Sequence, residues 1–133
     1  MKAFTLEIVT PSKLAFNAEV VSVTVPGTLG EFQVLFNHAP IVSNFEVGKL
    51  KIQTPDNELL YFATGGGVIE VLKNKVVILA QSLERSNEID AERAQQAVER
   101  ARQRLEQRDQ VDVARAEAAL TRGLNRLKVS ALR

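Results

Sequence analysis

The sequence of 133 residues predicts an α+β protein, with an N-terminal antiparallel β-sandwich followed by a C-terminal antiparallel two-helix hairpin. Short alternating or β-branched apolar runs, separated by turn residues, fill roughly the first 80 positions, which is typical of a sandwich or barrel. At Asp90 the apolar period changes to that of a helix. All six Phe and the single Tyr precede Ala63, whereas nine of the ten Arg follow Asp90. These observations divide the chain into residues 1–84 and 85–133.

The strands are predicted from apolar alternation bounded by Pro, Gly and Asn. They are expected at residues 4–9, 20–25, 30–36, 45–47, 50–52, 59–63, 68–72 and 76–80. Gly48-Lys49 is predicted to form a hairpin turn between two of these strands. Gly65-Gly66-Gly67 is expected to separate two others and to permit positive φ there.

Two helices are predicted after Asp90, whose carboxylate can accept free N–H groups at the start of the first. Their apolar faces are formed by Ala94, Ala97, Val98, Ala101 and Leu105, and by Val113, Ala116, Leu120, Leu124 and Leu127. The short polar connection at residues 106–110 predicts an antiparallel hairpin. Alanine buries little area, at about 25 cal/mol per Å². We therefore expect a weakly held hairpin that can adopt a second arrangement.

Composition excludes several classes of protein. The net charge of +1 gives no overall field for nucleic acid or an anionic membrane. No apolar run approaches the roughly 20 residues of a membrane span. There is no Cys, and His38 is the only His, so neither a thiol nucleophile nor a typical structural zinc site is expected.

The glycine run and the basic tail each suggest an alternative function. Gly65-Gly66-Gly67 lacks the Lys-Ser/Thr of a P-loop, and no nucleophile elbow accompanies His38, so we expect no enzyme. A small β-barrel that binds nucleic acid through an Arg-rich tail stays open as a remote alternative. It would need a basic, aromatic-bearing sheet face, whereas residues 1–83 are slightly acidic, with six Lys and seven acids.

Four segments in this order resemble the epsilon subunits of bacterial F-type ATP synthases. They are Gly30 with Asn37-His38-Ala39-Pro40, Gly48-Lys49-Leu50, Gly65-Gly66-Gly67 with Glu70-Val71 and Val76 to Leu79, and Ile89-Asp90 with Arg93-Ala94. The resemblance covers the whole chain. Phe32 and Gln33 depart from it, since an aliphatic residue and a glycine are usual there.

The resemblance implies a non-catalytic central-stalk subunit of a proton-translocating synthase, peripheral to the cytoplasmic face of the bacterial membrane through the complex. Its partners would be the gamma subunit, the polar loops of the c-ring and, with the hairpin extended, the alpha/beta catalytic hexamer. The extended hairpin would inhibit ATP hydrolysis. Glu31 and His38 would contact neighbouring subunits; ordinary exposed or turn roles are the alternatives.

A subset of these subunits binds ATP as a regulatory ligand, with an Mg²⁺ dependence that the sequence leaves open. The matching residues here are Glu84, Ile89, Asp90, Arg93, Ala94, Arg100, Arg122 and Arg126. Arg93 and Arg100 share one helix face, as do Arg122 and Arg126. An antiparallel hairpin would bring the four guanidinium groups toward a triphosphate. The alternative is a solvated arginine face with local ion pairs, in a stalk subunit that binds no nucleotide.

Overall fold

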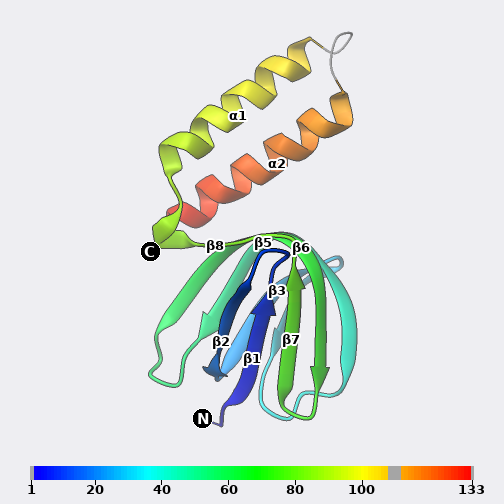
Figure 1. Cartoon of the computed structure of the whole chain (residues 1–133), viewed down its shortest axis with the longest axis vertical. Coiled ribbons are helices and arrows are strands. Elements are labelled where there is room, and N and C mark those ends of the chain that lie inside the picture. Colours follow the sequence, from blue (N-terminus) through cyan, green and yellow to red (C-terminus); the bar gives the residue numbers. More distant parts are fainter. Residues whose placement is uncertain (1, 108–111, 133) are drawn as a thin grey trace.

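The computed structural model describes residues 2–107 and 112–132. Its elements are β1 (Phe4–Val9), β2 (Leu14–Val20), β3 (Ser22–Gly27), β4 (Gly30–Val34), β5 (Ile41–Gln53), β6 (Leu59–Leu72), β7 (Lys75–Ala80), β8 (Leu83–Arg85), the 3₁₀ helix η1 (Ser86–Glu88), α1 (Ala91–Glu106) and α2 (Val113–Ser130). The strands form an N-terminal β domain, and the two helices project from one end of it (Figure 1). The predicted fold class is confirmed. Residues 108–110 of the predicted connection lie outside the described residues.

The described strands form one folded-over sheet, in the order β2-β1-β7-β6-β5-β3-β4, with β8 paired to β6. The second half of β6 pairs with β7, and its first half pairs with β8. β5 follows β6 along its whole length and also pairs with β3. The two long strands therefore belong to both layers of the sandwich and curve from one into the other (Figure 1).

Two predicted strand boundaries are wrong. Gly48-Lys49 is not a hairpin turn, because β5 runs through it as one strand of 13 residues. Gly65-Gly66-Gly67 lies inside β6, which is 14 residues long, rather than between two strands. Gly66 has a φ of 93°, and a Cβ on Gly67 would overlap the Leu79 carbonyl of β7. The glycines thus let β6 bend while it stays paired, so they serve curvature rather than chain reversal.

The structure adds features that the apolar pattern did not reveal. β2 and β8 were not predicted as strands, because β2 carries mostly exposed or half-buried residues and β8 has only three. β1 lies between β2 and β7 and pairs with β7 in parallel, from Thr5 opposite Lys75 to Val9 opposite Leu79. The sandwich is therefore antiparallel except for this one described pair.

The core of the sandwich is filled by the apolar residues that point inward from both layers. Phe4, Leu6 and Ile8 show the strict alternation predicted for the first strand. The buried set is Phe4, Leu6, Ile8, Val20, Val23, Val25, Val34, Phe45, Leu50, Ile52, Leu60, Phe62, Ile69, Val71, Val76, Ile78 and Ala80. Phe32 packs against this core from β4, and Gln33 lies beside it in the same strand, so both unusual residues occupy regular strand positions.

The helices pack against each other along small residues. Ala94, Val98 and Ala101 of α1 are buried, as predicted. On α2 the buried seam includes Gly123, which the apolar pattern did not indicate. A Cβ on Gly123 would lie 2.8 Å from Val98 Cγ2. The missing side chain therefore lets the two helix axes approach closely at this level.

The hairpin is attached to the sandwich mainly through the second half of α2. A small cluster joins Ala63 and Tyr61 of β6 to Ile89 and Val129. The side-chain amide of Asn125 donates to the backbone carbonyl of Gly48, with a nitrogen–oxygen distance of 2.8 Å. This small docking surface places one face of α2 over the curved part of β5 and β6, where a pocket forms.

Candidate functional site: a pocket between the sheet and the second helix

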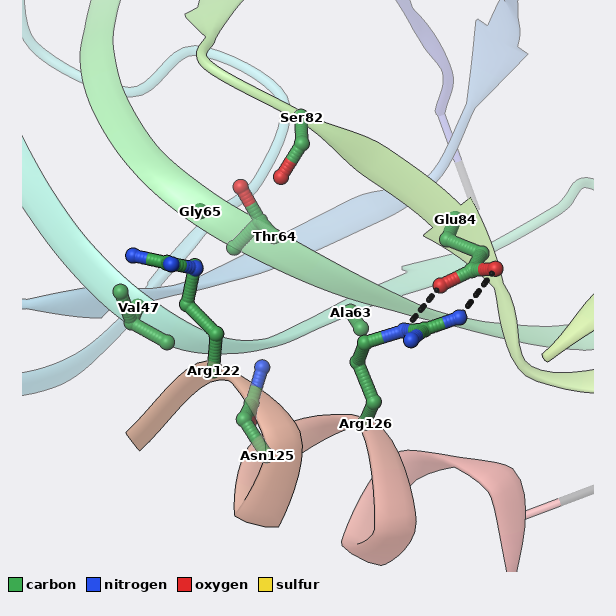
Figure 2. A pocket seen from close by; sticks show the side chains of 9 residues that line it. All are labelled: Val47, Ala63, Thr64, Gly65, Ser82, Glu84, Arg122, Asn125 and Arg126. Carbon is green, nitrogen blue, oxygen red and sulfur yellow. Dashed lines mark hydrogen bonds and ion pairs between the residues drawn. The ribbon is translucent and has the colours of Figure 1, made fainter. Parts of the chain in front are cut away.

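The pocket between α2 and the curved sheet has a volume of about 310 Å³. β5, β6 and the β7–β8 connection form one wall, and α2 forms the other (Figure 2). It is lined by Val47, Ala63, Thr64, Gly65, Ser82, Glu84, Arg122, Asn125 and Arg126. Three of the eight residues predicted to bind ATP are therefore brought together here: Glu84, Arg122 and Arg126.

Glu84 and Arg126 form a two-pronged ion pair at one end of the pocket (Figure 2). Arg126 Nε donates to Glu84 Oε1 at 2.8 Å, and Nη2 donates to Oε2 at 3.1 Å. The hydrogen bond that Arg126 donates to Glu84 raises the pKa of Arg126, partial burial opposes this, and the charges of Glu84 and Asp90 raise it further. Arg126 therefore remains a cation and faces two carboxylates, only one of which it binds directly.

Arg122 lies one helical turn before Arg126 and points toward Val47 and the sheet (Figure 2). Its side chain is exposed, and it makes no ion pair or hydrogen bond with the parts of the chain that the structure describes. A guanidinium group presents five donors in a rigid fork, which suits phosphate oxygens. Arg122 is thus the cation in this pocket whose donors are available.

The residues at the start of α1 have mainly structural contacts. Asp90 is the N-cap, as predicted, and its carboxylate accepts from the Arg93 backbone N–H at 3.1 Å. Ile89 is buried in the small cluster against Val129, and Ala94 is buried in the helix seam. These contacts fix where α1 begins relative to the pocket.

The remaining two predicted arginines lie outside the pocket. Arg93 and Arg100 are exposed on α1 and do not line the pocket, whose helical wall is α2. The structure therefore does not bring the four guanidinium groups together. A triphosphate that reached Arg93 or Arg100 would have to extend out of the pocket along the hairpin.

Several pocket residues were missed in the sequence. Asn125 lies three positions after Arg122, so helical spacing alone places both on one face of α2. Thr64 and Ser82 come from the sheet, and Thr64 Oγ1 accepts from the Gly66 N–H at 3.3 Å. No sequence spacing predicts that these hydroxyl groups lie opposite α2, because the bend in β6 brings them to the pocket.

Glu31 and His38 lie in or near the turns of the sandwich. Glu31 is exposed in β4, immediately after the β3–β4 turn. The half-buried His38 has its Nδ1 atom 2.7 Å from the Ala39 carbonyl, consistent with a turn role. Asn37 is held by Asn74, whose side-chain oxygen Oδ1 accepts from the Asn37 backbone N–H at 2.6 Å.

Among residues 2–107 and 112–132, no group of three or more His, Cys, Asp or Glu is arranged to hold a metal ion. No described helix is long and apolar enough to cross a membrane. Asp112 caps α2, because its carboxylate accepts from the Arg115 backbone N–H at 3.1 Å.

Comparison with known families matches nearly the whole chain. Residues 3–86 match the family described as the beta-sandwich domain of the ATP synthase delta/epsilon chain. Residues 87–131 match the long alpha-helix domain of the same chain. The chain belongs to the ATP synthase delta/epsilon family. As a member of this family it is a stalk subunit rather than a catalytic one.

Curated members of the delta/epsilon family share much of the sequence. The ATP synthase epsilon chain of Salinibacter ruber is 41% identical over 108 residues, covering 75% of this chain and 72% of that protein. The epsilon chain of Protochlamydia amoebophila is 45% identical, covering 76% and 69%. That of Carboxydothermus hydrogenoformans is 47% identical over 99 residues, covering 74% and 73%.

Solved structures show the same fold at lower identity. A chain in the Euglena gracilis mitochondrial ATP synthase, in a structure of OSCP, F1 and c-ring, has a TM-score of 0.85 and 22% identity. The match covers 98% of this chain and 82% of that one. A chain from the Tetrahymena thermophila central stalk and c-ring structure has a TM-score of 0.57 and 20% identity. Sandwich and hairpin are thus arranged similarly in the first of these.

Proposed function

We propose that this delta/epsilon chain couples the gamma subunit to the c-ring in a proton-translocating ATP synthase, peripheral to the cytoplasmic face of the bacterial membrane. The β domain contacts gamma and the polar c-ring loops, with Glu31 and His38 near the latter. The hairpin inhibits ATP hydrolysis when it extends into the alpha/beta hexamer. Bound ATP stabilises the folded hairpin and so limits this inhibition.

The observation that carries the ATP proposal is the pocket between α2 and the sheet. Glu84 offers carboxylate oxygens that can accept from an adenine amino group or a ribose hydroxyl. Arg122 and Arg126 offer forked donors for phosphate oxygens. Since one wall belongs to the sandwich and the other to the hairpin, a ligand that fills the pocket contacts both domains.

A ligand of this kind stabilises the folded hairpin by mass action. At a concentration 100 times its dissociation constant, it adds about 2.7 kcal/mol to the state it binds. The small docking surface of the hairpin makes a shift of this size sufficient to change which arrangement dominates. Ile89, Asp90 and Ala94 support the site by fixing the start of α1, while Arg93 and Arg100 meet the outer phosphates.

Calorimetric titration of the isolated chain tests the ATP site. We expect one-to-one binding that prefers ATP over ADP and GTP, measured with and without Mg²⁺. Arg126→Ala should weaken binding at least about tenfold, since a charge-assisted hydrogen bond contributes roughly 1.5–3 kcal/mol, and Arg93→Ala should weaken it less. Arg102→Ala is the matched control, because Arg102 pairs with Glu99 on the exposed side of α1. Equal binding by the Arg126→Ala protein would contradict the site and leave a stalk subunit without nucleotide regulation.

The contact with gamma is proposed for the outer face of the layer formed by β1, β7 and the adjoining halves of β6 and β5. Val9, Leu79 and Val68 lie side by side in the sheet register. Val42 is 70% exposed and Leu79 54% exposed on this face. Glu7 and Glu70 lie on the same face beside Val77, so the face carries an apolar patch bordered by carboxylates. A patch of this kind marks an interaction site.

Leu79→Lys should prevent co-purification with gamma while the isolated chain stays folded. A lysine at position 79 replaces apolar contact area by a charge that is costly to desolvate on binding. Leu59→Lys is the control, since Leu59 is 43% exposed at the start of β6, beside Gln53 in the other layer. Pull-down with gamma and circular dichroism of each variant are the measurements. Unchanged capture by the Leu79→Lys protein would exclude this face.

A further inference from the structure

The ion pair between Glu84 and Arg126 connects two parts of the chain that the folded hairpin brings together. Glu84 belongs to β8 of the sandwich, and Arg126 belongs to α2. Both guanidinium–carboxylate contacts are short, and the side chains of Arg126 and Glu84 are only 32% and 34% exposed. A forked pair that is partly shielded from water is stronger and more directional than an exposed one.

Few other contacts compete with this pair in fixing the hairpin. Across the described residues, the other ion pairs lie within one domain: Arg85 with Glu58 in the sandwich, and Arg102 with Glu99 in α1. α2 is also attached by the Asn125–Gly48 hydrogen bond and by the small cluster around Val129, and it contacts η1. The Glu84–Arg126 pair is thus the one described electrostatic link between the domains.

The same two side chains are those that a nucleotide would use. In this structure both Glu84 oxygens accept from Arg126. A phosphate group that approached Arg126 would meet the Glu84 carboxylate a few ångströms away, and like charges repel at that distance. Arg126 can therefore serve the phosphate fully only when Glu84 has turned away, for example toward the base.

We propose that the Glu84–Arg126 pair is a latch that favours the docked hairpin in the absence of nucleotide, and that a nucleotide replaces this pair instead of adding to it. The second half rests on the proposed ATP site; the first half does not. The folded hairpin is then held either by the Glu84–Arg126 pair or by contacts with bound ATP. The net stabilisation by ATP is the difference between the free energies that these two sets of contacts contribute.

The latch can be tested by distance measurements, because the chain has no native Cys. Asp56→Cys in the β5–β6 turn and Gln103→Cys on α1 place spin labels on exposed positions of the two domains. Double electron–electron resonance then reports the ratio of docked to undocked hairpin in the full chain. In buffer without nucleotide, Glu84→Gln should lower that ratio about fivefold, and added salt should lower it in the parent but not in this variant.

Two further variants separate a latch from a merely structural role. The charge exchange Glu84→Arg with Arg126→Glu retains a pair of opposite charges, so docking should return toward the parental ratio. The exchanged protein should not bind ATP, since a carboxylate at position 126 replaces the guanidinium group that donates hydrogen bonds to phosphate. Glu99→Gln removes the exposed pair inside α1 and should leave the distance distribution unchanged.

Displacement of Glu84 from Arg126 by ATP is measured separately, from the nuclear magnetic resonance signal of the Arg126 Nε–H group. This proton should exchange slowly while it is bonded to Glu84, disappear in Arg126→Lys and exchange faster in Glu84→Gln. Saturating ATP should shift the resonance of the Arg126 Nε–H proton.

If Glu84→Gln leaves the ratio of docked to undocked hairpin unaltered, the latch is wrong. If ATP binds while the Nε–H signal stays fixed, displacement is wrong although the ATP site stands. If ATP does not bind, the proposed ATP site and the displacement fail together, and the distance data still decide the latch.

Discussion

Replacing Gly67 with alanine should lower the free energy of unfolding of the β domain by about 4 kcal/mol, which is a larger loss than most single substitutions cause. A Cβ at this position would overlap the Leu79 carbonyl, a backbone atom of the neighbouring strand. Relief would require β6 and β7 to separate where β6 bends between layers. We expect a large fall in the midpoint of urea denaturation, followed by circular dichroism.

Gly30→Ala is the matched control for this substitution. Gly30 has a φ of 122°, yet nothing lies within 4 Å of an added Cβ. It therefore isolates the cost of the backbone conformation, on the order of 1–3 kcal/mol, from the cost of steric overlap. Should Gly67→Ala prove no less stable than Gly30→Ala, the proposed role of Gly67 in strand curvature would be refuted.

Gly123→Leu should open the helical hairpin while leaving the sandwich folded. Leucine is a better helix former than glycine, so α2 itself is not weakened. Its side chain would occupy the space in which Val98 now packs, because even a Cβ would lie 2.8 Å from Val98 Cγ2. Helices of this length are marginal alone in water, so the α1 amides should exchange with solvent at least about tenfold faster.

Two comparisons make this result specific. Ala118→Leu places the same side chain at an exposed position of α2 and should leave amide exchange in α1 unchanged. Gly123→Ala combined with Val98→Ala adds one methyl group on the α2 side of the seam and removes two from the α1 side. The pair should be more stable than the sum of its single effects predicts, by about 0.5–3 kcal/mol for residues in contact. Strict additivity would mean that Gly123 does not set the helix separation.

The sequence predicted those elements whose periodicity is decided by burial. β1 is buried on one side only, so Phe4, Leu6 and Ile8 alternate cleanly. α1 begins at the residue after Asp90 because the cap is local chemistry. The continuity of β5 and β6 was not predicted, since glycine marks a turn and a bend equally well. The pairing of β6 with β5 on both sides of the glycines, from Leu59 to Val71, distinguishes the two.

The site was predicted only where local spacing along a helix decides which residues lie together. Helical spacing placed Arg122 and Arg126 on one face, and both line the pocket. It also placed Arg93 and Arg100 on one face of α1, but spacing within a helix does not determine which neighbour that face meets. Thr64 and Ser82 depend on the curvature of β6, and the pairing of Glu84 with Arg126 depends on the docking of α2, so neither had a local signature.

The parallel pairing of β1 with β7 also has a consequence for how the protein is made. One edge of β1 pairs with β2, its neighbour in the chain, but the other edge pairs with residues 75–79. That edge of the first strand of the domain must therefore wait for one of the last. Pairings between such distant residues slow folding, whereas α1 and α2 are near neighbours in the chain. During synthesis the sandwich should therefore close late, at about the time when the hairpin begins to emerge.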